Sequence, residues 1–302
     1  MATTLDFFKT IDEFRQLVEG WDAAQPLTEL LPSYKAVRRE IINLTGQDTW
    51  DAILAYYNED PPEPEVEVMA RAVEFVQSAL ANLMMNQHFI FIAIRKNKTD
   101  GDIYKYQYDE LKEKYSIAAW ASMDELLGHL DANIATFTDY AALPAYLERQ
   151  NLILNSYIEF GKYFGIDSSP WFFTKLIFLI KEAQDDEILP RIGSWDDVKK
   201  DATIAEKVKR ALAYHTMYLA LDRFDFTSLP GTIRSQAGNE GNRTINIRYS
   251  DDAAKLLLAN KLRQKAAEYF TDIELLIKQL STAGLTSPVN PNTETDGFYQ
   301  MT

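Results

Sequence analysis

The sequence has 302 residues, 46% of them hydrophobic and 25% charged, which is typical of a globular protein long enough for two modest cores. Its formal net charge of −14 disfavours a broad nucleic-acid-binding face, because an acidic surface repels phosphate backbones. The absence of cysteine excludes disulfide frameworks, thiolate zinc sites and cysteine nucleophiles.

The N-terminal segment predicts three short helices followed by a surface loop. Apolar residues recur at helical spacing within residues 10–20, 33–44 and 48–57. A Thr-Gly pair at 45–46 is a stop signal for the second helix, and the acidic, proline-rich stretch 58–67 predicts a loop. The start of the chain lacks the basic and apolar features of a signal peptide, so none is expected.

A long helix is predicted to begin near Val68 and to end near His88. After it, alternating apolar residues predict a β-hairpin in which residues 90–94 pair with residues 103–108. The longest uncharged run, residues 75–94, carries several polar side chains. We therefore interpret it as a buried helix followed by a strand, not as a membrane span.

Local signals place further helices in the middle of the chain. Ser122 or Asp124 is a candidate cap for a helix over residues 125–137. The Ser-Ser-Pro run at 168–170 is a helix start signal, because proline is tolerated in the first turn. A second long helix is predicted over residues 201–224, and like the first it carries several alanines.

The order of elements then repeats. A second hairpin is predicted in which residues 232–234 pair with residues 243–249, followed by a helix over residues 251–280. Ile-Arg pairs at 94–95 and 233–234 occupy the same point in each copy. Duplication of one module is one interpretation of this pattern, and chance similarity between helical patterns is the other.

We therefore predict a mainly α fold of two tandem helical modules, each with a long helix and a small β-hairpin, plus an extended C-terminal tail. The first module spans residues 1–140 with its hairpin near 90–108. The second spans residues 141–280 with its hairpin near 232–249, and the tail spans 281–302.

The hairpins and the tail are the candidate interaction surfaces. An exposed strand edge recruits a further strand, so we expect an oligomer, and head-to-tail contacts that close would make a ring. Basic residues at the hairpins could meet acidic patches of a neighbour, or they could be solvated turn charges. The tail could be disordered, or it could be an arm anchored on a neighbouring subunit by two aromatic residues. The candidate interaction residues are Arg95, Lys96, Lys98, Arg234, Arg243, Arg248, Phe298 and Tyr299.

The sequence contains no recognised catalytic, metal-binding or cofactor-binding motif. A P-loop, a GxGxxG run after a strand, a GxSxG elbow and Glu-x-x-His are all absent. The histidines are His88, His129 and His215, and we interpret His215 as a hydrogen-bonded core residue, not a zinc ligand. Acidic runs such as residues 185–187 are interpreted as helix caps and solvated faces. We therefore predict no catalytic residues, no metal and no cofactor, and we expect that the protein is not an enzyme.

Three segments carry a resemblance to a known family, namely SYKAVRREIINLTGQDTWDAI, ALAYHTMYLALDRFDFTSLPGTIR and YFTDIELLIKQL. They resemble an α-helical family encoded beside portal and capsid genes in tailed phages, notably phages of Bacteroidetes. The simpler module, a helix ending in Leu-Thr-Gly and followed by a loop and a long helix, is similar to small phage head–tail connectors. The resemblance covers most of the chain up to about Leu280, although this chain is longer than single-module connectors.

The resemblance implies a structural virion protein, made in the host cytoplasm, that forms a ring beneath the portal. The implied partners are further copies of the chain, the portal protein and other tail or connector proteins, with no membrane. DNA would pass through the ring without specific binding, and an acidic lumen would lower friction. Two alternatives come from other classes: a metal-dependent hydrolase with a non-motif acidic site, and a cytoplasmic helical scaffold protein.

Overall fold

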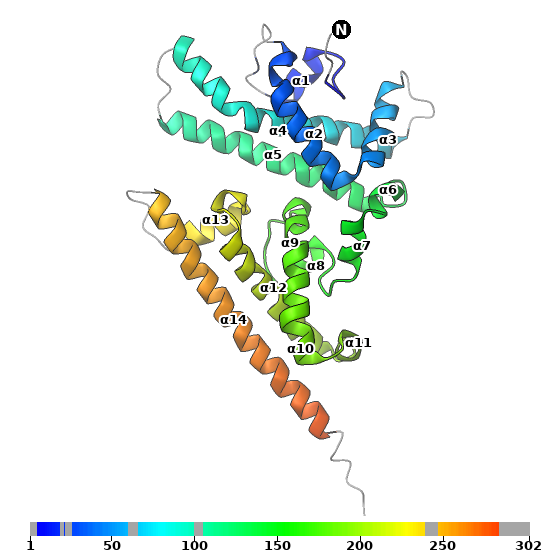
Figure 1. The fold of residues 1–302 in the computed structure, drawn as a ribbon, viewed down its shortest axis with the longest axis vertical. Coiled ribbons are helices and arrows are strands. Elements are labelled where there is room, and N and C mark those ends of the chain that lie inside the picture. Colours follow the sequence, from blue (N-terminus) through cyan, green and yellow to red (C-terminus); the bar gives the residue numbers. More distant parts are fainter. Residues whose placement is uncertain are drawn as a thin grey trace, which may run out of the picture. The chain divides into compact units, whose positions relative to one another are not determined.

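The computed structural model describes residues 5–18, 21, 26–59, 66–99, 105–238 and 247–283. These residues form helices joined by short connections, and no strand occurs among them (Figure 1). The predicted mainly α fold is therefore confirmed.

The chain divides into two compact units. Unit 1 comprises residues 1–151 together with residues 169–175, and unit 2 comprises residues 152–168 together with residues 176–302. The chain thus passes to unit 2, returns to unit 1 for seven residues and then stays in unit 2. Each unit is described by itself below.

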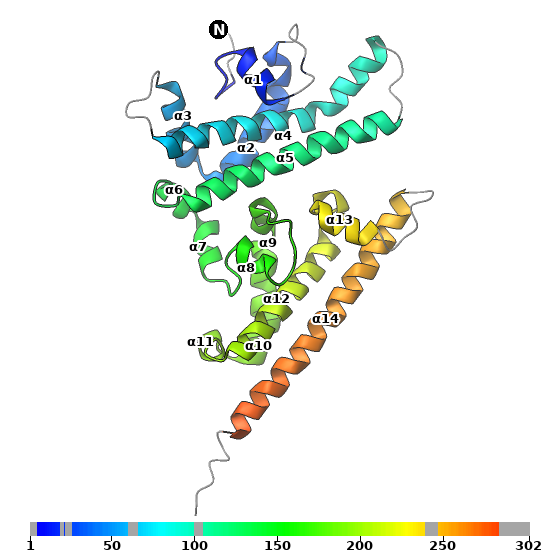
Figure 2. The same ribbon diagram turned by 180° about the vertical axis from the view of Figure 1, so that it is seen from behind.

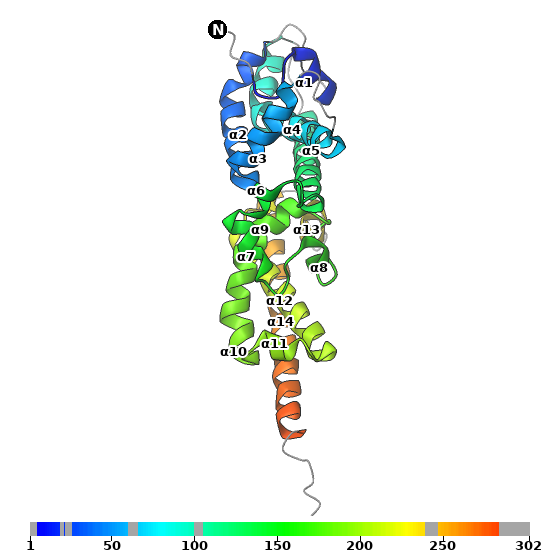
Figure 3. The same ribbon diagram turned by 90° about the vertical axis from the view of Figure 1, so that its right-hand side faces the viewer.

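Unit 1 is organised around α4, which contacts four other helices of the unit. Helices α4 and α5 make the most extensive contact within the unit, and α1, α2 and α3 also pack against α4. Seen edge-on in Figure 3, α2 and α5 lie on opposite sides of α4. The helices of unit 1 are α1 (Ile11–Leu17), α2 (Leu31–Thr45), α3 (Gln47–Asn58), α4 (Glu67–Thr99), α5 (Lys105–Ala132), α6 (Thr138–Ala141) and α7 (Pro144–Gln150), with a 3-10 turn, η1, at Leu27–Leu30.

The core of unit 1 is rich in aromatic side chains from the N-terminal segment. Phe7 packs edge-on against Trp50 with ring centroids 4.9 Å apart, and Phe14 contacts Phe8 and Trp21 in the same way. Edge-to-face pairs add to the free energy gained by removing these large apolar surfaces from water. The N-terminal segment is thereby fixed onto the α3–α4 scaffold.

Gly46 makes the sharp turn between α2 and α3. Its φ of +86° lies in the region that favours glycine, and its N–H donates to the Ile42 carbonyl at 2.8 Å. A side-chain carbon at this position would also come within 3.0 Å of Leu143. The stop signal that the sequence predicted at residues 45–46 is confirmed.

The first predicted hairpin is wrong. Residues 90–94 continue α4, which ends at Thr99, and residues 105–108 form the first turn of α5. The buried ring of Phe89 on α4 packs against Tyr108 and Tyr115 of α5, at 4.9 and 5.7 Å between centroids. Adding residues to an existing helix costs little, whereas an isolated two-stranded hairpin is marginal. Helix propagation and helix–helix packing therefore outweigh the preference for a strand that the alternating apolar residues indicated.

Unit 2 is organised around the pair α12 and α14, which lie side by side in Figures 1 and 2 and make the most extensive contact of the unit. α9 begins in unit 1 and contributes its residues from Leu176 onward to unit 2. The helices are α8 (Tyr157–Gly161), α9 (Pro170–Ala183), α10 (Leu189–Ile192), α11 (Trp195–Val198), α12 (Ala202–Arg223), α13 (Gly231–Gly238) and α14 (Ile247–Ala283), with a π turn, η2, at Gln184–Ile188 and a 3-10 turn, η3, at Phe226–Ser228.

The second predicted hairpin is also wrong. Residues 232–234 lie in α13, and residues 247–249 form the first turn of α14; residues 239–246 lie outside the described part of the chain. Ile233 is fully buried, and α13 packs against α14. The first turn of α13 is capped from a distant loop, because the Asp167 carboxylate accepts the Thr232 N–H at 3.0 Å. Burial and this cap favour a helix where the local pattern predicted a strand.

Candidate functional site

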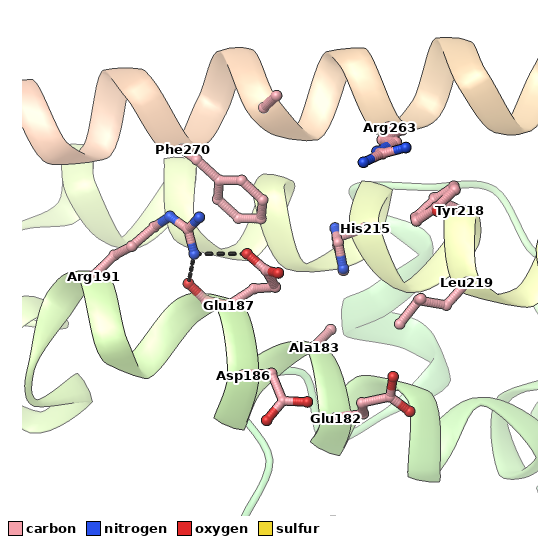
Figure 4. A pocket seen from close by; sticks show the side chains of 11 residues that line it. Glu182, Ala183, Asp186, Glu187, Arg191, His215, Tyr218, Leu219, Arg263 and Phe270 are labelled. Atoms are coloured by element: carbon pink, nitrogen blue, oxygen red, sulfur yellow. Dashed lines mark hydrogen bonds and ion pairs between the residues drawn. The ribbon is translucent and has the colours of Figure 1, made fainter.

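Unit 2 contains a pocket of about 400 Å³ bounded by α9, η2, α10, α12 and α14. In Figure 4, His215 lies near the centre of the view, with Arg263 on the α14 side and Glu182 and Asp186 on the opposite side. The small residues Ala183 and Ala267 line facing walls, where larger side chains would fill the space. Concave sites of this size that gather a few polar groups are the usual form of small-molecule sites.

The π turn η2 supplies the acidic wall of the pocket. It follows α9 without a break and contains Asp186 and Glu187. It is anchored at its start, where the Gln184 side-chain oxygen accepts the Ile153 N–H at 2.8 Å. Because a π turn holds one more residue than an α turn, it redirects the side chains that follow, and such turns are frequent at functional sites.

Some of the charged side chains at the pocket are paired with one another. Arg191 donates to the Glu187 carboxylate at 2.7 Å and lies 3.2 Å from Glu274, while its guanidinium covers the Phe270 ring at 4.5 Å. Glu182 accepts two hydrogen bonds from Arg223, at 2.5 and 2.6 Å. These pairs neutralise two of the three carboxylates of the pocket.

Four other polar groups of the pocket are not used in this way. His215, Tyr218, Arg263 and Asp186 make no hydrogen bond or ion pair with any described residue. The His215 ring instead contacts the rings of Tyr218 and Phe270, at 5.6 and 5.7 Å between centroids. Arg263 lies 5.6 Å from the Tyr218 ring. An imidazole, a phenol, a guanidinium and a carboxylate are therefore available in one hollow.

The interpretation of His215 as a hydrogen-bonded core residue is wrong. Its side chain is half-buried at the pocket, and no described residue is its hydrogen-bond partner. Burial lowers the pKa of His215 below its ordinary value, although the nearby Glu187 and Glu182 act in the opposite direction. The imidazole is therefore neutral near pH 7 and offers one donor and one acceptor nitrogen.

Unit 1 has a second, more open hollow of about 380 Å³ between α2, α4 and the start of α9. The Lys175 ammonium lies 3.9 Å from the centroid of the Trp171 ring and 4.8 Å from that of Trp120. Burial lowers the pKa of Lys175 and raises that of Glu40, the carboxylate on the facing helix. The two indole rings stabilise the ammonium group of this lysine by cation–π contact within unit 1. We therefore do not assign Lys175 to a ligand.

The described residues include no group of three or more histidine, aspartate or glutamate side chains that could hold a metal ion. In the unit 2 pocket two of the three carboxylates are neutralised by arginines, an arrangement that suits a polar ligand better than a cation. A search of the same residues for a helix long and apolar enough to cross a membrane also finds none.

The sequence-predicted interaction residues are distributed over both units. Arg95, Lys96 and Lys98 lie in the last turns of α4. Arg234 lies in α13, where its Nε atom is buried without a hydrogen-bond partner in the described structure, and Arg248 lies in the first turn of α14. Arg243, Phe298 and Tyr299 lie outside the described residues.

Sequence reasoning missed the pocket of unit 2. Its residues are spread from Glu182 to Phe270, and they meet only because α12 and α14 pack together beside the end of α9. The one local signal was the acidic run at residues 185–187, which we interpreted as a solvated face. The sequence of residues 185–187 contains no pattern that predicts a π turn.

The fold and the pocket define a mainly α protein of two units, with a small polar pocket in the second. Two stretches of the chain, residues 41–149 and 181–282, match DUF6712, a family of unknown function. These stretches make up more than half of the sequence, so the chain belongs to this family. No curated protein and no solved structure matches the chain.

Proposed function

We propose that this protein is a structural component of a tailed-phage virion, a head–tail connector or adaptor that forms a ring beneath the portal. The resemblance described above suggests this class, and the apolar surface at the end of α14 supports a role in assembly. Under this proposal the protein binds further copies of itself, the portal protein and other tail or connector proteins, while DNA passes without specific binding.

The carrying observation is an apolar stripe on α14 that continues past its covering helices. Residues spaced three or four apart are buried against the rest of unit 2 and then become exposed in the same register. Ile277 is partly exposed, and Leu280 is 53% exposed. The buried part of the stripe consists of Ala259, Leu262, Ala266, Phe270 and Ile273.

The length of α14 explains why the stripe is uncovered. α14 has 37 residues and α12 has 22, a difference of about 22 Å at 1.5 Å per residue. Two cross-helix ion pairs hold α14 near this point, Lys207 with Asp272 and Arg191 with Glu274. Beyond Glu274 the orange end of α14 extends past α10 and α12 in Figure 1.

We assign this exposed end to contact with a second copy of the chain. Leu276, Ile277 and Leu280 continue the stripe toward the end of α14 and form what we call the α14 end patch. Copies with a net charge of −14 repel one another, so stable self-association requires apolar contact to offset that repulsion. A continuous apolar seam on a projecting helix provides such contact.

Sedimentation of the purified protein, alone and with its portal protein, tests the proposal, and negative-stain imaging shows whether rings form. We expect a closed oligomer, and we expect Ile277→Glu with Leu280→Glu to give monomers. Leu147→Glu is the matched control, because Leu147 is 54% exposed on α7 of unit 1 and is not part of the patch. A wild-type chain that stays monomeric with no affinity for any virion component would contradict the proposal.

The repeated use of a long helix pair also suggests that the two units arose by duplication of one module. In unit 1 the pair is α4 and α5, and in unit 2 it is α12 and α14, with α13 between them in sequence. Ring assembly from such a chain would place two related modules in every protomer. Expression of residues 1–151 and of residues 152–302 as separate chains, followed by circular dichroism, tests whether each half folds as a helical module.

A further inference from the structure

We propose that the pocket of unit 2 binds a small zwitterion, with the anionic group of the ligand at Arg263 and its cationic group near Asp186. The inference does not rest on the connector proposal, because it concerns side chains other than those of the α14 end patch. Its basis is the charge that remains in the pocket once the internal ion pairs are subtracted.

The pairing pattern leaves one free charge of each sign. Glu187 is engaged by Arg191, and Glu182 is engaged by Arg223. Arg263 and Asp186 also line the pocket, and neither forms an ion pair with a described residue. A monoanion would leave the carboxylate unmatched, and a monocation would leave the guanidinium unmatched. A molecule that carries both charges matches both.

The two free charges lie on different walls. Arg263 is on α14, whereas Asp186 is on the π turn η2, and Figure 4 shows His215 of α12 between them. A ligand that reaches both charges must therefore carry them at separated ends. This separation favours an amino acid, with its ammonium and carboxylate groups held apart by carbon atoms.

The space between the charges suits a short carbon chain. The rings of Phe270, Tyr218 and His215 provide flat apolar surface, and Leu219 adds an aliphatic contact. A volume of about 400 Å³ is at the small end of the range for ligand sites, so it fits a molecule of amino-acid size. The neutral imidazole of His215 can donate or accept one hydrogen bond without adding charge.

Isothermal titration with ω-amino acids of increasing length tests the inference on the full chain. The series runs from glycine through 3-aminopropanoate and 4-aminobutanoate to 6-aminohexanoate, so it varies only the separation of the charges. We expect one length to bind best. Butanoate and butylammonium, which carry a single charge each, should bind at least about tenfold more weakly than the best zwitterion, because each lacks one charge-assisted contact.

Matched variants locate the binding. Arg263→Gln and Asp186→Asn should each weaken binding of the best zwitterion by about tenfold, the effect of one lost charge-assisted hydrogen bond. Lys261→Gln on α14 and Asp185→Asn on η2 make the same changes of charge at neighbours that are exposed like Arg263 and Asp186 but do not line the pocket, and should leave binding unchanged. Ala267→Trp, at an exposed lining position, should block binding by filling the space.

Three results would overturn the inference. The first is no binding of any member of the series at millimolar concentration to the folded wild type. The second is equal binding of butanoate or butylammonium, which would assign the pocket to a singly charged ligand. The third is equal loss of affinity in the control variants, which would place the binding elsewhere on the surface.

Discussion

Arg149 makes two hydrogen bonds to the carboxylate of Asp131, from Nη1 to Oδ2 at 3.0 Å and from Nη2 to Oδ1 at 3.2 Å. The pair joins α7 to the end of α5 and is almost completely removed from solvent. The Tyr140 hydroxyl donates to the same carboxylate at 3.0 Å, and the guanidinium covers the Tyr146 ring at 4.3 Å. Burial raises the pKa of Tyr140, which keeps this hydroxyl a donor over the whole working range of pH.

Asp131→Asn should lower the free energy of unfolding of unit 1 by about 3 kcal/mol, because it leaves the buried Arg149 cation without a counter-charge. Urea denaturation followed by tryptophan fluorescence measures the effect. The control is Asp12→Asn at an exposed ion pair with Arg15, which should change the free energy by less than about 0.5 kcal/mol. Equal effects of the two substitutions would show that the buried pair stabilises the fold no more than an exposed ion pair does.

Ser169→Ala should cost about 2 kcal/mol of stability. The fully buried Ser169 hydroxyl accepts the Phe172 N–H at 3.0 Å and the Trp120 Nε1–H at 3.1 Å, and it donates to Asp124 at 2.6 Å. Removing it leaves buried polar groups without partners, and that costs more than the loss of an exposed cap. Thermal unfolding measures the change in stability, and the tryptophan emission maximum reports on the environment of Trp120.

The matched control for Ser169→Ala is Ser156→Ala. Ser156 also accepts an N–H at the start of a helix, from Glu159 at 3.2 Å, but it is only partly buried. Its loss should cost about 1 kcal/mol or less. A larger loss of stability at Ser156 than at Ser169 would contradict the argument that the buried hydroxyl contributes more than the partly buried one.

Two substitutions of Asp167 separate its cap from its backbone strain. Asp167 has a φ of +55° and accepts the Thr232 N–H that starts α13. Asp167→Ala removes the cap and keeps a side chain in the left-handed region, so it should cost about 1 kcal/mol, whereas Asp167→Gly removes the cap but also relieves the backbone strain and should therefore change stability by less than about 0.5 kcal/mol. Amide hydrogen exchange in α13 should rise in both. If alanine were tolerated as well as glycine, the strain argument would be wrong.

The stability of unit 2 should fall on acidification because of His215. Its pKa is lowered by burial, so the unfolded chain takes up a proton near pH 6.5, before the folded chain does. As the pH falls below about 6.5 the unfolded state therefore binds more protons and gains stability relative to the folded state. The charges that face the imidazole are those of Glu182, Glu187, Arg191 and Arg263.

The measurement is the difference in unfolding free energy between the wild type and His215→Gln as a function of pH. We expect a flat difference above about pH 7 and a progressive relative loss for the wild type below about pH 6.5, since glutamine does not titrate. Parallel curves across pH 5–8 would show that the folded protein does not disfavour the His215 cation.

Local features of the sequence were enough for the helical class and for several helix ends. Gly46 ends α2 because the left-handed backbone conformation at this position favours glycine, so the residue type alone predicts the end of the helix. The start of α9 at Pro170 was likewise predicted from the residues beside it. Such signals act within a few residues, so sequence reasoning reaches them.

The same local reasoning failed where distant residues decide. Asp124 was a candidate cap for its own helix, but it lies within α5, and its carboxylate accepts hydrogen bonds from Ser169 and from the Trp171 N–H at 2.6 and 2.9 Å. Alternating apolar residues after His88 predicted a strand, but Phe89 packs on α5 and the helix continues. Propensity is a weak preference that tertiary packing overrides.

The residues themselves therefore determined that the chain is helical and where several of its helices begin and end, because caps and glycine turns depend on near neighbours. Only the tertiary structure decided which helices pair and which side chains meet. The pocket of unit 2 is the clearest case, since Asp186, His215 and Arg263 come from three elements. Their proximity follows from how buried apolar faces pack together, and no stretch of sequence records that packing.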